Sequence, residues 1–97
     1  MGLLDALFRR PLSRMDFVGR ACSAVIHGGQ VRADGVVFDA ATYAFTIARG
    51  NETATLPLDH LYREYVAAPA GERDAVFSVI ATTAAELVAP IHRRLAP

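Results

Sequence analysis

The sequence predicts an α+β domain in which helices pack on one face of an antiparallel sheet. Three observations lead to this fold class. Apolar residues recur at helical spacing over residues 13–27 and again after residue 58, whereas residues 30–58 alternate as strands do. The helical and strand segments are grouped along the chain, which is typical of α+β domains. A length of 97 residues fits a single domain spanning 1–97.

The first ten residues carry apolar side chains on one face of a short amphipathic helix over 1–10, which Pro11 ends. Three docking places are open to this helix: its own sheet, a partner chain, or a membrane surface with Arg9 and Arg10 at the headgroups. A segment this short binds lipid weakly, so a membrane is the least favoured of the three. The apolar residues are Leu3, Leu4, Leu7 and Phe8.

A longer helix is predicted over residues 13–27. Ser13 is suited to cap its first turn, and Asp16 stands three residues later, as in an acidic form of the capping box. Gly28-Gly29 ends the helix, because glycine adopts the left-handed cap conformation at little cost. The predicted apolar stripe consists of Met15, Val18, Cys22 and Val25, widened by Ala21 and Ile26.

Three strands are expected between residues 30 and 58. Over 43–47, large apolar residues alternate with small or polar ones, the pattern of a strand with one buried face. Gly50-Asn51 supplies the turn to the next strand. A hairpin at Asp34-Gly35, reaching back to Val31, would add a short fourth strand. The three main strands are placed at 36–38, 43–47 and 53–56.

Two helices are expected after the sheet. The first begins at Asp59 or His60, and its inward side chains are Leu61, Tyr62, Tyr65 and Val66. The second begins near Glu72, whose carboxylate suits the positive end of the helix dipole. Pro90 ends or kinks it, and residues 90–97 form a frayed tail. Its predicted buried residues are Val76, Phe77, Val79, Ile80, Thr83 and Leu87.

Composition and charge argue against several classes of protein. Ten basic residues, all arginine, balance ten acidic ones, so the surplus of positive charge that phosphate binding needs is missing and we expect no nucleic-acid partner. The longest uncharged apolar stretch, Ala75–Ala85, is shorter than the roughly 18–20 residues that span a bilayer. Cys22 is the single cysteine, which excludes an internal disulfide. A secretory signal is not visible, and the cytoplasm is the expected location.

The residues that could carry chemistry are few. His60 and Glu64 stand four apart, so they share a helix face at a spacing compatible with a metal, but two ligands do not make a site. Cys22 lies in an apolar stripe and is expected to be a small buried hydrophobe. No nucleophile, acid–base pair or phosphate loop stands out. We therefore expect neither catalytic residues, nor a metal, nor a cofactor, and predict that the chain is not an enzyme.

One segment resembles a known family. Residues 55–65, TLPLDHLYREY, are followed by Ala68-Pro69 and Glu72-Arg73, and this stretch resembles the strand-then-helix segment of the YtpQ family of uncharacterised bacterial proteins. The resemblance covers residues 1–85 and implies an α+β fold and a bacterial origin, without an activity. His60 stands where the family tends to asparagine. The order of elements is also similar to small secretion-chaperone-like folds, whose members dimerise and bind protein segments.

These observations lead to two functional hypotheses. The first is a non-enzymatic protein-contact or chaperone-like module that acts as a homodimer or binds a protein partner, because a short chain that is 53% hydrophobic has apolar surface for a partner to cover. Its candidate contact residues are Leu3, Leu7, Phe8, Phe45, Tyr62 and Tyr65. The alternative is a small-molecule-binding or enzyme-accessory domain. Its candidate pocket is lined by His60, Tyr62 and Glu64.

Overall fold

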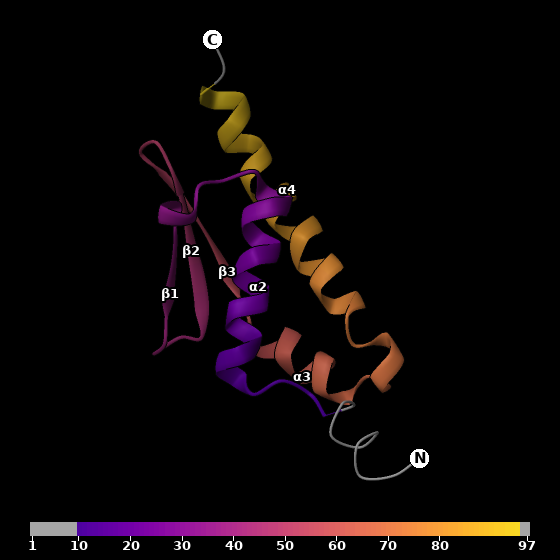
Figure 1. Cartoon of the computed structure of the whole chain (residues 1–97). Coiled ribbons are helices and arrows are strands. Elements are labelled where there is room, and N and C mark those ends of the chain that lie inside the picture. Colours follow the sequence, from indigo (N-terminus) through magenta and orange to yellow (C-terminus); the bar gives the residue numbers. More distant parts are fainter. Residues whose placement is uncertain (1–9, 96–97) are drawn as a thin grey trace.

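The computed structural model describes residues 10–95 (Figure 1). In chain order the elements are α2 (Arg14–Gly29), the 3-10 helix η1 (Ala33–Gly35), β1 (Val36–Asp39), β2 (Ala44–Arg49), β3 (Glu52–Pro57), α3 (Asp59–Ala67), the 3-10 helix η2 (Ala70–Glu72) and α4 (Ala75–Leu95). Helices and an antiparallel sheet follow one another as predicted, which confirms the α+β class. Leu3, Leu7 and Phe8 of the predicted first helix lie outside the described residues.

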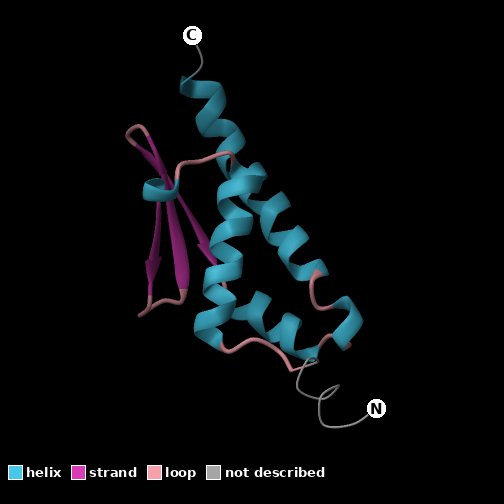
Figure 2. Ribbon diagram, in the orientation of Figure 1, coloured by secondary structure: helices cyan, strands magenta, loops and turns pink. Residues whose placement is uncertain are grey.

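The sheet has the order β1-β2-β3, with both neighbouring pairs antiparallel. Its register places Phe38 opposite Phe45, and Phe45 opposite Leu56, so that rows of apolar side chains cross one face. Helices α2 and α4 lie against that face, while the other face is not covered by the described elements (Figure 2). The side chains of the covered face are Val36, Phe38, Phe45, Ile47, Ala54 and Leu56.

A fourth strand does not form within residues 10–95. Residues Ala33–Gly35 instead make one turn of 3-10 helix, closed by a hydrogen bond from the Gly35 N–H to the Arg32 carbonyl at 2.9 Å. This turn packs tightly on β2, since a Cβ on Gly35 would lie 2.7 Å from the carbonyl oxygen of Ala48. The predicted hairpin at Asp34-Gly35 is therefore wrong: its glycine serves a close approach to a strand.

Helix α2 begins as predicted and ends differently. The Ser13 hydroxyl accepts a hydrogen bond from the backbone N–H of Asp16 at 3.1 Å, which satisfies one of the free donors of the first turn. At the other end, Gly28 and Gly29 are still helical, and Gln30 takes the left-handed conformation with φ of 53°. The helix therefore ends on a residue that bears a side chain, at a cost of about 1–2 kcal/mol relative to glycine.

The glycines that were expected to stop α2 bring it close to α4. A Cβ on Gly28 would lie 2.3 Å from the carbonyl oxygen of Ala81, so only glycine fits there. The buried residues Phe17, Ala21 and Val25, each at 0% exposure, recur at helical spacing on the same side of α2 as Gly28. Met15, placed in the predicted stripe, is instead 66% exposed. Val18, Ala21 and Val25 are buried as predicted, so the prediction is wrong only in part. The difference arises because small residues, which add little to a hydropathy pattern, form much of the seam between the helices.

Helix α4 buries Val76, Phe77 and Ile80 as predicted, but the rest of its buried stripe differs from the prediction. Val79 is 50% exposed, and Thr83 and Leu87 are only partly buried. The helix continues through Pro90 to Leu95, so the proline neither ends it nor leaves residues 90–95 as a frayed tail. Burial of Val88 and Ile91 on either side of Pro90 offsets the backbone hydrogen bond that proline cannot donate. The buried stripe consists of Val76, Phe77, Ile80, Ala84, Val88 and Ile91.

By length and composition, one described stretch could cross a membrane: residues Ala70–Arg93, with mean hydropathy 1.5 in its most apolar window. The uncharged run Ala75–Ala85, on which the sequence-based expectation rests, is only a part of this stretch, which continues past Glu86. A single such helix is weak support for a membrane span, because core helices of soluble proteins pass the same test. Helix α4 packs against α2 and β3, and 33% of that apolar window is buried inside the structure.

The core at the start of α2 is aromatic. Phe17 is fully buried, and its ring centroid lies 5.1 Å from that of Tyr62, 5.1 Å from that of Tyr65 and 5.3 Å from that of Phe77. These edge-on and tilted contacts join α2 to α3 and α4. Leu61 and Tyr65 form the buried face of α3, whereas Val66, predicted to point inward, is 40% exposed. The α3 helix thus closes the end of the domain where α2 begins.

Candidate binding cleft at the start of helices α2 and α3

An open cleft lies where the first turns of α2 and α3 meet the loop between β1 and β2. Its volume is about 500 Å³, within the range of small-ligand sites. We call it the Arg14 cleft, after the basic residue in its lining. The lining consists of Arg14, Met15, Phe38, Ala40, Ala41, Thr42, Tyr43 and Asp59.

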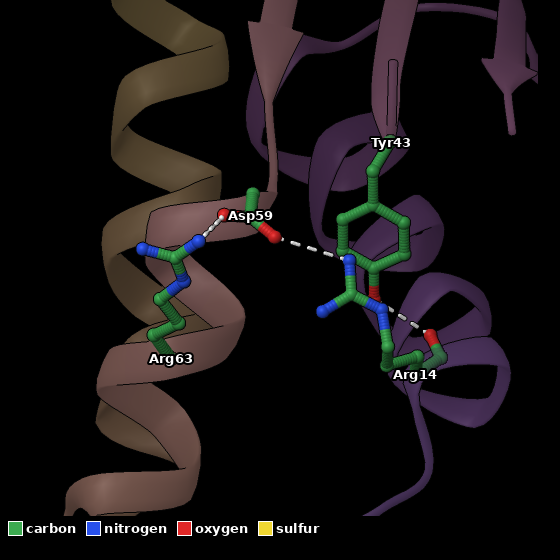
Figure 3. A network of polar contacts seen from close by, with 4 residues as sticks. All are labelled: Arg14, Tyr43, Asp59 and Arg63. Carbon is green, nitrogen blue, oxygen red and sulfur yellow. Dashed lines mark hydrogen bonds and ion pairs between the residues drawn. The ribbon is translucent and has the colours of Figure 1, made fainter. Parts of the chain in front are cut away.

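Three charged side chains form a chain of ion pairs at the cleft. Arg14 Nη2 lies 3.1 Å from Asp59 Oδ1, and Arg63 Nη2 lies 2.7 Å from Asp59 Oδ2 (Figure 3). The Arg14 and Asp59 side chains are 49% and 42% exposed, so their attraction is screened by water and contributes little to stability. Because the carboxylate is shared between two guanidinium groups, the three side chains together carry one net positive charge.

Two aromatic rings support the Arg14 side chain. The guanidinium carbon lies 4.0 Å from the ring centroid of Tyr43 and 5.2 Å from that of Tyr62. Cation–π contacts of this kind favour a guanidinium plane laid on the ring face, with its N–H groups directed sideways. The Arg14 side chain is therefore held in place although half of it is exposed to solvent.

Tyr43 is placed by an unusual backbone conformation. Its φ is 51°, a left-handed value that bulky residues rarely adopt. The hydroxyl donates to the Arg14 carbonyl at 2.7 Å, and the Tyr43 carbonyl accepts from the Leu58 N–H at 3.0 Å. Burial raises the pKa of the Tyr43 hydroxyl above its ordinary value, and this outweighs the opposite effect of the Arg14 charge. The Tyr43 side chain therefore stays neutral to a higher pH than a tyrosine exposed to water does.

The other two tyrosines hold the backbone of Leu12. The Tyr62 hydroxyl donates to the Leu12 carbonyl at 2.9 Å, and the Tyr65 hydroxyl accepts from the Leu12 N–H at 3.0 Å. All three tyrosines of the chain therefore bind the segment Leu12–Arg14 through their hydroxyl groups. We call these three contacts the tyrosine anchor. It fixes the chain directly before α2, next to the cleft.

The uncovered face of the sheet is a second candidate surface. The register aligns Val37, Thr46 and Thr55 in one row across the three strands. Val37 is 60% exposed. The only charged side chain in the three rows of this face is that of Asp39, at a corner, and it accepts a hydrogen bond from the Ala41 N–H at 3.0 Å. The neighbouring rows consist of Ala48 with Thr53, and of Asp39, Ala44 and Pro57.

The structure separates most of the residues that the sequence suggested for a site. Phe45 and Tyr65 are 1% and 4% exposed, so both belong to the core and neither offers a contact surface. His60 and Glu64 are exposed on α3, and the cleft described above is lined by other residues. Residues 10–95 contain no group of three or more potential metal ligands. Tyr62 is half-buried and belongs to the tyrosine anchor.

The sequence alone does not indicate that Arg14, Tyr43 and Asp59 form one site. Arg14 and Asp59 are separated by 45 positions, and Arg14 and Tyr43 by 29, so no local spacing connects them. The one signal in the sequence is that Asp59 stands at a helix start, and helix capping explains that position equally well. No family model matches the chain, and no curated protein or solved structure is similar enough to count as a match.

Proposed function

We propose that the chain is a non-enzymatic protein-contact module that forms a homodimer through the uncovered face of its sheet. The observation that carries the proposal is the one-sided covering of the sheet by α2 and α4 (Figure 2). Antiparallel sheets that face water usually carry polar and charged side chains there. The central row of this face, which consists of Val37, Thr46 and Thr55, carries no charge and includes an exposed valine.

The charge of this face favours a second copy as the partner. A twofold symmetric contact places the same surface on both sides, so a charged surface would repel itself. The central row is uncharged, so two copies of this face would not repel each other there. The carboxylate of Asp39, at the corner, is engaged by the Ala41 N–H. The YtpQ resemblance supports a bacterial origin, and a single free cysteine is compatible with the cytoplasm.

Light scattering over a concentration series tests the proposal. We expect wild type to show twice the chain mass, and Val37→Arg and Thr55→Arg to show the single mass with an unchanged circular dichroism spectrum. Both side chains are exposed, so the substitutions should leave the fold intact. Val79→Arg is the matched control, because Val79 is also an exposed valine, at 50%, but lies on α4. It should remain dimeric.

Two results would contradict the proposal. A wild-type chain that is monomeric at every concentration would exclude the homodimer. If Leu7→Glu dissociates the dimer while Val37→Arg does not, the contact surface lies in the first ten residues and the sheet face is the wrong assignment.

A further inference from the structure

We propose that the Arg14 cleft is a binding site for a carboxylate carried on an apolar group. This site is distinct from the uncovered sheet face, and the inference does not depend on the dimer. It combines three features found at one place: a cavity of about 500 Å³, an arginine held on aromatic rings, and an apolar wall.

The arginine has hydrogen-bond donors to offer. Within residues 10–95, the Arg14 guanidinium donates a single hydrogen bond, from Nη2 to Asp59 Oδ1 at 3.1 Å. A guanidinium has five N–H donors in a planar fork that matches a carboxylate. The Tyr43 ring, 4.0 Å below the guanidinium carbon, fixes the plane of that fork. A ligand carboxylate would therefore meet a donor edge that is already oriented.

The charge distribution selects an anion. Asp59 is the one acidic residue in the lining, and Arg63, at 2.7 Å from its Oδ2, already balances its charge. When a ligand carboxylate takes the donors of Arg14, Asp59 retains Arg63 as its partner. The positive charge of Arg14 is thus the one that a ligand can neutralise.

The rest of the lining selects an apolar group next to the carboxylate. Met15 is 66% exposed at the cleft, and its flexible thioether adapts to different shapes. The Phe38 ring packs edge-on against Tyr43, with ring centroids 5.6 Å apart, and adds an apolar surface to the lining. The loop side of the cleft is lined by Ala40 and Ala41, whose small side chains leave room for a ligand. Both a small aromatic acid and the C-terminus of a chain that ends in an apolar residue carry this chemistry.

Nuclear magnetic resonance titration of the full chain tests the proposal with four probes. These are 3-phenylpropionate, its uncharged amide, the peptide acetyl-Gly-Phe with a free C-terminus, and the same peptide with a C-terminal amide. We expect the acids to shift the backbone amide signals of Phe38, Ala41 and Thr42, and the amides to leave them in place. Tighter binding of the peptide acid identifies a chain terminus as the ligand, and tighter binding of 3-phenylpropionate identifies a small acid.

Three variants separate a binding role from a structural one. Arg14→Gln should weaken the acids about tenfold or more, because a charge-assisted hydrogen bond is lost. Asp59→Asn should tighten them several-fold, because it removes a carboxylate that competes for the same donors. Arg20→Gln is the matched control and should change nothing. Arg20 lies on the same helix, stacks on Phe77 at 4.6 Å and pairs with Asp74 at 3.9 Å, all outside the cleft.

Arg14→Gln and Asp59→Asn are expected to change the affinity for the acids in opposite directions. The test therefore stays decisive even if one of the two variants is less stable. The proposal is overturned if acids and amides shift the same signals equally, if neither acid binds at about 20 mM, or if Asp59→Asn weakens binding as Arg14→Gln does.

Discussion

Arg14 and Tyr43 hold each other by two separate contacts. The guanidinium of Arg14 lies on the Tyr43 ring, 4.0 Å from its centroid, and the Tyr43 hydroxyl donates to the Arg14 carbonyl at 2.7 Å. The first contact joins the two side chains, and the second joins the Tyr43 side chain to the backbone of Arg14. The two contacts fasten the first turn of α2 to the residue that precedes β2. The walls of the cleft are fixed relative to one another in this way.

Tyr43→Phe should reveal a pH dependence of stability. The hydroxyl has a pKa raised above its ordinary value of about 10, chiefly because it is buried. In the unfolded chain the tyrosine ionises at the ordinary pKa, whereas in the folded protein it stays neutral to higher pH. Its contribution is therefore complete below about pH 10 and is lost as pH rises through the folded-state pKa.

Urea unfolding of wild type and Tyr43→Phe at pH 8 and pH 11 measures this effect. We expect wild type to be more stable by about 1 kcal/mol at pH 8. The difference should shrink or reverse at pH 11, where a phenylalanine has nothing to ionise. A difference that stays constant between the two pH values would contradict the raised pKa.

Gly28→Ala and Gly19→Ala should change stability in opposite directions. Both glycines lie in α2, but a Cβ on Gly28 would lie 2.3 Å from the Ala81 carbonyl oxygen, whereas a Cβ on Gly19 would have nothing within 4 Å. Gly28→Ala must push α2 and α4 apart, at a cost of about 1–3 kcal/mol. Gly19→Ala should add about 0.5–1 kcal/mol through helix propensity. Thermal unfolding of the two variants checks this, and equal shifts would show that the helices do not touch at Gly28.

The tyrosine anchor should be worth a measurable part of the stability. Tyr62→Phe removes the donor to the Leu12 carbonyl, and Tyr65→Phe removes the acceptor for the Leu12 N–H. Each should lower the free energy of unfolding by about 1 kcal/mol in urea titrations. Because both bonds hold one residue, the double variant should lose less than the sum of the two. Strict additivity would indicate that the bonds act independently.

The sequence predicted the elements of this fold well because each is encoded locally. The Ser13 cap, the alternation over 43–47 and the Gly50-Asn51 turn need only their neighbours to be recognised. The predictions are wrong at positions whose burial or conformation depends on a residue far away in the sequence. The sequence pattern predicts a helix end at Gly28, whereas in the structure this glycine permits the close approach of Ala81. The pattern also predicts that Val79 points inward, whereas the buried positions of α4 include small residues such as Ala84.

The candidate site was less predictable than the fold for the same reason. Its arginine comes from α2, its tyrosine from the loop before β2 and its aspartate from α3, and only the folded chain brings these segments together. Phe45 and Tyr65 suggested a contact surface because they are large and aromatic, but such residues are also what a core needs. The sequence therefore indicated how many apolar residues there are without indicating which of them a partner could reach.

The tyrosine anchor also bears on the order in which the chain can assemble. Its three hydrogen bonds join residues 29, 50 and 53 positions apart. During synthesis, the start of α2 therefore leaves the ribosome long before Tyr62 and Tyr65 are available to hold it. Closing such long loops is slow compared with forming a helix. The segment Leu12–Arg14 is consequently among the last parts of the described domain to be held in place.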